Sequence, residues 1–415
     1  MNAKFHCTRC HCHSKNPFAQ RCEHCGGILE VCHPASPADR ILAWTPNDSM
    51  WRYASSMLID PRAVRMSLGE GGTPLIEAPQ MASQLGIEQL LLKLELVNPT
   101  GSFKDRALSA AATHARHHGS AGLVGSSSGN ALHAQAAYAA LAELPSLALV
   151  PVTVSADRLV QPTRCGTRVV RVRGDYSDCH RLARTAASLS GWYNVSTTYE
   201  NPVGFDAYKT MAYELWEACE DTVDWIVIPV GAGPLLGAMA QGYADIVAAS
   251  RCPTAPALLG IQASNCAPIV RAFERGVPTV TPWDGDAASV AKGIADPLRG
   301  YAEDGTYTLA AVIGSGGAMV SVSEAEIEEA TRSLARICGL HVDPAAAATI
   351  AGLEVATRRG IVPAGSSVIA VITGTGFKEV PADFSLAELG AVFDPDVDPI
   401  ESILPQEVSH DTTSY

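Results

Sequence analysis

The chain has 415 residues, of which 47% are hydrophobic and 18% charged, so it is long enough for two or three domains and is not a disordered or fibrous chain. Thirty basic residues against 43 acidic ones give a net charge of −13, which argues against binding to nucleic acid or to an anionic membrane. No apolar run reaches the roughly 18 residues that span a bilayer, and the N-terminus lacks an apolar signal core. We therefore expect a soluble cytoplasmic protein.

The N-terminal segment contains two Cys-x2-Cys pairs, Cys7 with Cys10 and Cys22 with Cys25. Two such pairs supply four thiolates to a tetrahedral Zn²⁺, and a site filled by four protein ligands is structural. Disulfides or idle thiols are the alternatives, but disulfides are rare in a reducing compartment. Other side chains compete as ligands, and we rank them below the four cysteines: His6, His11, His13, His24 and Cys12.

From residue 34 onward a loop-rich stretch leads into alternating strand-like and helix-like segments. Short apolar runs predict strands at 90–96, 122–126, 147–152, 168–172, 225–230, 258–262 and 368–373. Amphipathic segments between them predict helices, among them 105–118, 130–143, 205–220 and 325–338. This alternation is typical of parallel sheets covered by helices on both faces, and ligands bind such sheets at the carboxyl ends of the strands.

Lys104 follows the first of these strands, in the run Asn-Pro-Thr-Gly-Ser-Phe-Lys-Asp-Arg at 98–106, and stands at the start of a helix. The positive end of the helix dipole disfavours an ammonium there and lowers its pKa, so the amine can act as a Schiff-base nucleophile. Taken alone, the residue is better explained as a solvated lysine in a first helical turn.

Three further segments occupy the same topological position, at the end of a strand. Ser-Ser-Ser-Gly-Asn at 126–130 offers hydroxyl and N–H groups to an anion, although an ordinary helix cap has the same composition. Gly-Ala-Gly-Pro-Leu-Leu-Gly at 231–237 can cradle a phosphate, although glycine-rich turns are common. Thr-Gly-Thr-Gly at 373–376 ends a fourth strand. Their shared position predicts one ligand site.

The order of these motifs resembles threonine synthase and its close relatives among the fold-type II enzymes that use pyridoxal 5′-phosphate (PLP). The segments that carry the resemblance are Gly-Glu-Gly-Gly-Thr-Pro-Leu at 69–75, the lysine motif, Ser-Ser-Gly-Asn at 127–130, Pro-Val-Gly-Ala-Gly at 229–233 and Thr-Gly-Thr-Gly-Phe-Lys at 373–378. In addition, Cys-Gly-Gly-Ile-Leu-Glu-Val at 25–31 is similar to the end of a zinc ribbon that some members carry.

The resemblance implies an α/β fold of the tryptophan synthase β type, with two doubly wound parallel-sheet domains and a small N-terminal zinc ribbon. The implied segments are a zinc ribbon at 1–33, a large PLP-binding domain at 34–105 and 206–390, a small α/β domain at 106–205 and a polar tail at 391–415. A homodimer with a small amino acid substrate, and with no nucleic-acid or membrane partner, completes the expectation.

The same resemblance assigns roles to single residues. Lys104 carries PLP covalently and later moves protons, Phe103 packs beside the cofactor ring, and Asn130 hydrogen-bonds its O3′ oxygen. Thr373 meets the pyridine nitrogen, where a neutral hydroxyl suits elimination or replacement at Cβ or Cγ better than transamination. The cofactor phosphate is held by the loop Gly231, Ala232, Gly233, Pro234 and Leu235, and the substrate by Ser127, Ser128 and Lys209.

Three departures from threonine synthases concern the substrate. Gly204 stands where those enzymes have an Arg for the substrate phosphate, Ala131 replaces a Thr, and Asp343-Pro-Ala-Ala-Ala replaces Glu-Pro-Ala-Ser-Ala. Losing one charge-assisted contact costs roughly 1.5–3 kcal/mol, about one to two decades in affinity, which Lys209 or another Arg can restore. Seven arginines lie at 158, 164, 168, 171, 173, 181 and 184, and we interpret them as a solvated face.

The function implied is a PLP-dependent lyase that eliminates a γ-substituent such as phosphate from O-phospho-L-homoserine and adds water to give L-threonine. The alternative within the same class is β-elimination or β-replacement on another substrate, as in cysteate synthase-like enzymes or enzymes of specialised metabolism. An alternative of another class is a non-catalytic scaffold whose zinc ribbon binds a protein or nucleic acid. The presence of Lys104, Asn130 and Thr373 weighs against that scaffold.

Overall fold

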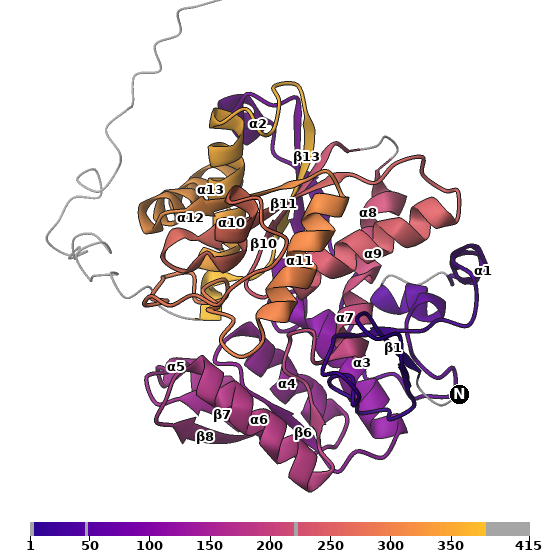
Figure 1. Cartoon of the computed structure of the whole chain (residues 1–415). Helices are drawn as coiled ribbons and strands as arrows, with labels where there is room; N and C mark the ends of the chain where they lie inside the picture. The colour runs from indigo at the N-terminus through magenta and orange to yellow at the C-terminus, as the bar shows by residue number, and fades with distance from the viewer. Residues whose placement is uncertain (1–3, 46–48, 220–222, 379–415) are drawn as a thin grey trace, which may run out of the picture. The chain divides into compact units, whose positions relative to one another are not determined.

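Three sheets organise the residues that the computed structural model describes, which are 4–45, 49–219 and 223–378 (Figure 1). The N-terminal sheet is antiparallel, in the order β2-β1-β3. Its strands are β1 (Phe5–Cys7), β2 (His13–Ser14) and β3 (Leu29–Val31). The predicted polar tail at 391–415 lies outside the described residues.

The largest sheet has six strands in the order β12-β11-β10-β13-β5-β4, all parallel except that β4 pairs antiparallel with β5. Its strands are β4 (Leu75–Glu77), β5 (Gln89–Leu94), β10 (Trp225–Pro229), β11 (Ala257–Ala263), β12 (Ala318–Val322) and β13 (Ser367–Ile372).

Helices cover both faces of this sheet because successive residues of its strands project to opposite sides. Ile226 and Ile228 of β10 belong to the hydrophobic core that includes residues of α8, α9 and α11, whereas Val227 between them belongs to the core with α12 and α13. Figure 1 shows α12 and α13 on one side of the sheet and α8 and α9 on the other. These helices are α8 (Thr210–Ala218), α9 (Pro234–Ala248), α11 (Ala302–Gly314), α12 (Glu324–Cys338) and α13 (Pro344–Arg358).

The third sheet is parallel and has four strands in the order β8-β7-β6-β9, with α6 packed on one face and α4 and α5 on the other. Its strands are β6 (Leu123–Gly125), β7 (Ser146–Pro151), β8 (Arg168–Val172) and β9 (Tyr193–Asn194). Its helices are α4 (Asn130–Leu141), α5 (Asp157–Arg164) and α6 (Tyr176–Ser190).

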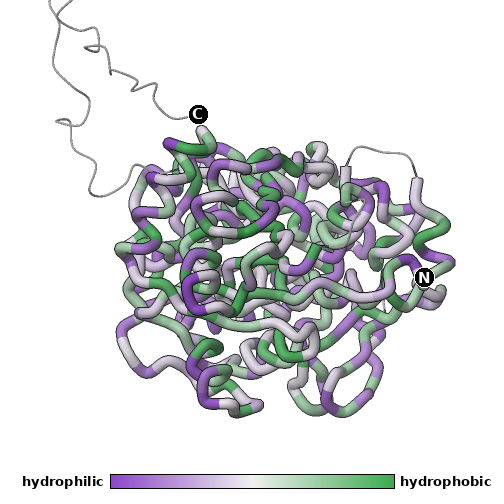
Figure 2. Tube along the Cα trace, turned by 90° about the horizontal axis from the view of Figure 1, so that it is seen from above, coloured by the Kyte–Doolittle hydropathy of each residue, from purple (hydrophilic) through white to green (hydrophobic). Residues whose placement is uncertain are grey.

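The remaining helices connect the sheets or flank them. They are α1 (Pro37–Leu42), α2 (Pro79–Leu85), α3 (Lys104–His117), α7 (Pro202–Tyr208) and α10 (Pro268–Glu274), with short 3-10 helices η1 (Met50–Ser56), η2 (Glu95–Val97), η3 (Ser264–Cys266) and η4 (Gly376–Lys378). Hydrophobic and hydrophilic residues are interspersed along the coloured trace (Figure 2). Among the described residues no helix is long and apolar enough to cross a membrane.

The parallel α/β architecture predicted from the sequence is confirmed, and each of the seven predicted strands corresponds to a strand of the structure. The helix predicted over 205–220 differs, because it begins earlier, at Pro202, and is divided at Lys209 into α7 and α8. The four-stranded sheet lies within 106–205, and the six-stranded sheet is built from residues on both sides of that segment. The predicted domain boundaries agree with this division but stay a prediction.

Candidate active site

Three neighbouring parallel strands, β5, β13 and β10, end at the same edge of the six-stranded sheet. Thr373 directly follows β13, and Gly231 comes two residues after β10. Lys104, the first residue of α3, follows β5 after the short helix η2. The backbone N–H of Phe103 donates to the carbonyl oxygen of Thr373 at 3.0 Å. The sheet therefore brings the predicted lysine, threonine and glycine loop to one edge.

The ammonium of Lys104 is desolvated. Burial lowers the pKa of Lys104 to about 7, while the nearby carboxyl group of Asp296 acts in the opposite direction. Its Nζ lies 4.4 Å from the ring centre of Phe103 and 5.8 Å from that of Tyr208. The lowered pKa agrees with the sequence prediction, but its leading cause is burial rather than the helix dipole. An amine with this pKa is largely neutral, and so nucleophilic, slightly above pH 7.

A buried ion-pair network fixes the start of α3 beneath Lys104. Arg106 is fully buried, and its guanidinium donates to Glu95 at 2.6 and 2.8 Å and to Glu214 at 2.6 and 2.8 Å. Lys93 donates to the same Glu214 at 2.7 Å. Burial alone would raise the pKa of Glu214, but Arg106 and Lys93 hold it at about 2. The carboxylate therefore stays charged at neutral pH and ties β5, η2, α3 and α8 together.

The loop after β10 turns its carbonyl groups toward surrounding side chains. Gln262 donates to the carbonyl of Gly231 at 3.3 Å, Thr308 to that of Ala232 at 2.6 Å, and Tyr199 to that of Gly233 at 3.0 Å. In the part of the chain that the structure describes, the N–H groups of residues 231–233 donate to no protein acceptor. Three consecutive uncommitted N–H groups at the start of α9 suit a phosphate.

Glycine is required at position 233 of this loop. Its φ of +96° lies in the left-handed region, and a Cβ there would come within 2.3 Å of the Thr308 side chain. Pro234 occupies the first position of α9, where the N–H that proline lacks has no partner within the helix. The sequence of the loop thus follows from its tight entry into the helix.

Two buried hydroxyl groups near Lys104, Ser102 Oγ and the phenol of Tyr208, have no hydrogen-bond partner among the described residues. Buried polar groups normally have one, so both hydroxyls are available to a bound molecule. Together with the low-pKa amine of Lys104 and the uncommitted N–H groups of 231–233, they form a donor set that fits PLP: an amine for its aldehyde carbon and N–H groups for its phosphate.

The start of α4 meets the end of β13 through Asn130. Its Nδ2 donates to Asp343 at 2.8 Å, and its Oδ1 accepts from Lys378 at 2.5 Å. A Cβ at Gly374 would lie 2.8 Å from the Asn130 amide, so glycine permits this approach beside Thr373. Asn130 thus lies next to the residues that border Lys104. Its predicted hydrogen bond to the cofactor ring stays a prediction, as do the roles of Phe103 and Thr373.

The predicted substrate-binding serines lie on the same turn. Ser127 and Ser128 are half-buried, and Ser127 Oγ accepts the N–H of Gly129 at 3.2 Å in the turn that begins α4. Lys209 lies elsewhere: its Nζ is 2.6 Å from Asp206 and 3.2 Å from His33, and the residue is only 4% exposed. Among the described residues Lys209 makes no contact with these serines, and its predicted role in substrate binding stays a prediction.

Two cationic side chains that the sequence did not single out lie beside this turn. Arg158 of α5 places Nη1 3.9 Å from the position that a Cβ on Gly129 would take, and Lys378 contacts Asn130. The pKa of Lys378 is lowered to about 8, mainly by burial and in part by the charge of Arg158, while Asp343 and Asp105 act in the opposite direction. The other six arginines between 158 and 184 are exposed, as predicted, whereas Arg158 is half-buried.

Asp296 is a further residue that the sequence prediction missed. It lies in the loop before α11, where its Oδ1 accepts the Tyr301 hydroxyl at 2.7 Å and the Leu298 N–H at 3.0 Å. Burial raises the pKa of Asp296 above its ordinary value. No motif or periodicity marks this aspartate, but its Cβ lies 3.6 Å from the position that a Cβ on Gly231 would take, and its charge acts on the pKa of Lys104.

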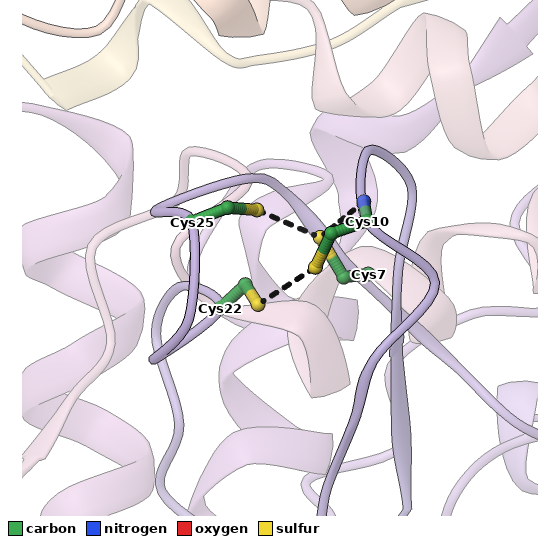
Figure 3. A group of neighbouring side chains, drawn as sticks. All are labelled: Cys7, Cys10, Cys22 and Cys25. Atoms are coloured by element: carbon green, nitrogen blue, oxygen red, sulfur yellow. Dashed lines mark hydrogen bonds between the residues drawn. The ribbon is translucent and has the colours of Figure 1, made fainter.

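The four predicted cysteine ligands form one cluster (Figure 3). Their sulfur atoms all lie within 4.8 Å of one another, with Cys7 to Cys25 and Cys10 to Cys22 both at 3.5 Å. Two thiolates on one tetrahedral zinc are about 3.8 Å apart, so this arrangement fits such an ion. A Cβ at Gly27 would lie 2.9 Å from the Cys7 sulfur, which explains the glycine after the second pair. The cluster can therefore hold a metal ion.

A model of the pyridoxal-phosphate dependent enzyme family matches residues 66–374, which include every strand and loop of the lysine site. The chain belongs to this family. A threonine synthase of Methanosarcina acetivorans is 31% identical over 397 residues, covering 94% of this chain and 96% of that protein. A threonine synthase of Mycobacterium tuberculosis is 34% identical over 337 residues, covering 81% and 89%.

Solved structures of the same fold belong to other PLP enzymes. Maize serine racemase aligns with a TM-score of 0.64 at 18% identity, over 82% of this chain and 96% of that one. A fungal L-serine ammonia-lyase from Rhizomucor miehei aligns with a TM-score of 0.62 at 20% identity, over 76% and 96%. These likenesses show the fold of fold-type II PLP enzymes, as the sequence analysis expected.

Proposed function

We propose that this PLP-dependent enzyme is a lyase of the threonine synthase type, which eliminates phosphate from O-phospho-L-homoserine and adds water to give L-threonine. The named relatives, about 30% identical over most of both chains, support this reaction type. The observation that carries the choice of an anionic substrate is the pair of cations, Arg158 and Lys378, beside the turn at Gly129 and Asn130. In this proposal they supply the positive charge that threonine synthases place at the position of Gly204 with an arginine.

When bound, PLP supplies an electron sink for negative charge at the substrate Cα. Lys104 Nζ is the group that removes and returns the substrate protons, and its pKa of about 7 suits both tasks near neutral pH. Ser127 and Ser128, with the N–H groups at the start of α4, bind the substrate carboxylate. Arg158 and Lys378 bind the phosphate and stabilise it as it leaves.

Asp296 holds a charge or a proton next to Lys104. Because burial raises its pKa, the carboxyl group can be protonated closer to neutral pH than an exposed aspartate. In its ionised form it favours the protonated lysine. We assign Asp296 the task of balancing the charge of Lys104 as protons move on and off Nζ.

The second candidate is β-elimination or β-replacement on a different amino acid, and it is favoured by the surroundings of Gly204. A Cβ at 204 would lie 2.6 Å from Asn201 Nδ2 and 3.1 Å from Ala107 Cβ, so the backbone here leaves little room for the arginine of threonine synthases. The two candidates share the cofactor and the lysine. They differ in whether the substrate carries a phosphate.

The test is to supply the PLP-loaded enzyme with O-phospho-L-homoserine and to measure phosphate and the amino acid formed. We expect equal amounts of phosphate and threonine. Arg158→Gln should raise KM for this substrate by about 10- to 100-fold, the value of one charge-assisted contact, whereas Arg164→Gln on the same helix, which is exposed, should not. No turnover of phosphohomoserine, with turnover of serine derivatives instead, would favour the second candidate.

The four-cysteine cluster completes the proposal. We assign it a structural Zn²⁺, because all four ligands come from the protein and none is left for a substrate.

A further inference from the structure

Arg21 links the N-terminal segment to the helix that borders the lysine site. It immediately precedes Cys22, one of the four clustered cysteines. Its Nη2 lies 2.5 Å from Asp304 Oδ1, and its Nε lies 3.5 Å from Glu200 Oε1. The Arg21 side chain is 11% exposed, and both carboxylates are buried. Because Asp304 stands in the first turn of α11, this ion pair joins the four-cysteine cluster to that turn.

The first turn of α11 is in turn connected to the glycine loop after β10. Asp304 Oδ2 accepts the N–H of Tyr199 at 3.3 Å, and the Tyr199 hydroxyl donates to the Gly233 carbonyl at 3.0 Å. Thr308 lies one helical turn after Asp304, and its hydroxyl donates to the Ala232 carbonyl at 2.6 Å. Two short paths, both through Asp304, therefore connect the guanidinium to the loop.

The same turn of helix also fixes Asp296, the carboxyl group that acts on Lys104. The backbone N–H of Asp304 donates to the carbonyl of Tyr301 at 3.0 Å, and the Tyr301 hydroxyl donates to Asp296 at 2.7 Å. A displacement of this turn would therefore move both the glycine loop and the charge beside the lysine.

Removal of the Arg21 guanidinium would leave two buried carboxyl groups without the cation between them. The pKa of Asp304 is raised to about 6, mainly by burial, and burial also raises the pKa of Glu200, while Arg21 acts in the opposite direction on both. Such groups take up a proton or move toward water, and either response loosens the turn. Arg9 offers a contrast: its Nη2 is 2.7 Å from Glu303 in the same turn, but its side chain is 54% exposed, and exposed ion pairs contribute little.

We propose that Arg21 is a positioning residue that couples the four-cysteine cluster to the loop at 231–233, and hence to the binding of PLP. A metal ion that fixes Cys22 also fixes the neighbouring backbone from which Arg21 reaches Asp304. The inference rests on two parts of the proposed function, the cofactor phosphate at 231–233 and the metal at the four cysteines. It does not depend on which amino acid is the substrate.

The test measures how tightly the full-length, PLP-loaded enzyme retains its cofactor. Visible absorbance on dilution gives the dissociation constant, and the ³¹P NMR signal of the bound cofactor reports the surroundings of its phosphate. Coupling between two sites typically changes affinity by about 5- to 150-fold, so Arg21→Gln should weaken PLP binding at least about fivefold and shift the ³¹P signal. Arg21→Lys, which keeps the charge, should weaken it less.

Arg9→Gln is the matched control, because it removes an exposed arginine of the same segment whose partner is next to Asp304. It should change neither the dissociation constant nor the ³¹P signal. Asp304→Asn breaks the ion pair from the other side, and combining it with Arg21→Gln should weaken PLP binding no more than the stronger single substitution. Unchanged PLP binding in Arg21→Gln would overturn the proposal, as would equal weakening in Arg9→Gln or fully additive effects in the double variant. If Arg21→Gln does not fold, Arg21→Lys and Asp304→Asn decide in the same way.

The link to the metal has its own measurement. Coupling of affinities is reciprocal, so bound PLP should make zinc harder for a chelator to remove, and Arg21→Gln should abolish this difference. A difference that persists in Arg21→Gln would contradict the role of this residue. Gly233→Ala separates the inference from its premise: unchanged PLP affinity in Gly233→Ala would remove the loop as the phosphate site, whereas weakening there without weakening in Arg21→Gln would overturn only the coupling.

Discussion

Lys104 should react as an amine far more acidic than an ordinary lysine. At pH 8 an amine with a pKa of about 7 is roughly 90% neutral, whereas one at 10.5 is about 0.3% neutral, a difference of about 300-fold in the reactive form. The cause is burial of Nζ beside Phe103 and Tyr208. The rate of a reaction that requires the neutral amine should therefore rise with pH only up to about pH 7 to 8 and then level off.

Acetylation by acetic anhydride measures this directly, because only neutral amines react. The PLP-free protein is labelled briefly between pH 5 and 10, and mass spectrometry quantifies the peptide that contains Lys104. We expect half-maximal labelling near pH 7. A rate that still climbs tenfold per pH unit between pH 8 and 10 would refute the argument from burial.

The direction in which Asp296 changes the pKa of Lys104 can be tested in the same assay. Its carboxylate raises the pKa of Lys104 against the effect of burial. Asp296→Asn removes that charge and should shift the half-maximal pH of Lys104 labelling downward, while Asp296→Glu, which keeps the charge, should shift it less. An upward shift in Asp296→Asn would contradict the arrangement described here.

Three further predictions test the scaffold. Arg106→Met leaves two carboxylates buried without their main partner and should lower the free energy of unfolding in urea by about 3–5 kcal/mol; a loss below about 1 kcal/mol would contradict the network. Gly233→Ala forces a Cβ against Thr308 and should weaken PLP binding at least about tenfold by fluorescence titration, so an unchanged affinity would exclude this loop as the phosphate cradle. Cys22→Ser with Cys25→Ser should lower the yield of folded enzyme without changing substrate choice, and an undiminished yield would argue against a structural metal.

The sequence predicted the strands well because parallel strands that are buried on both faces consist of nearly continuous apolar residues. β12 (Ala318–Val322) was missed, since its five residues include a serine and its place is set by pairing with β11. β9 has two residues, too few for any periodicity. The division of the predicted 205–220 helix at Lys209 was also beyond the sequence pattern, because no proline or glycine stands at the break.

The site likewise contains residues that the sequence predicts and residues that it misses. Thr373 and the loop at 231–235 follow β13 and β10 closely, and Lys104 follows β5 after a short connection, so the topology of a parallel sheet was sufficient to predict that they meet. Arg158 is one of seven similar arginines in the sequence, and only the packing of α5 against α4 distinguishes it. Asp296 lies in a loop without a motif, and its proximity to Lys104 depends on the tertiary fold.

For the phosphate-bearing substrate that we propose, the surroundings of Gly204 show why the positive charge has to come from elsewhere in this chain. Asn201 caps α7 by accepting the Gly204 N–H at 3.0 Å, and Tyr193 holds the same Asn201 oxygen at 2.7 Å. An arginine at 204 would press its Cβ against this cap and against Ala107 on α3, the helix that begins with Lys104. Gly204→Arg would therefore disturb α3 as well as add a charge, and a loss of activity in this variant would say little about the substrate. Arg158→Gln removes a charge from α5 near the start of α4, so it tests recognition of the phosphate more directly than Gly204→Arg does.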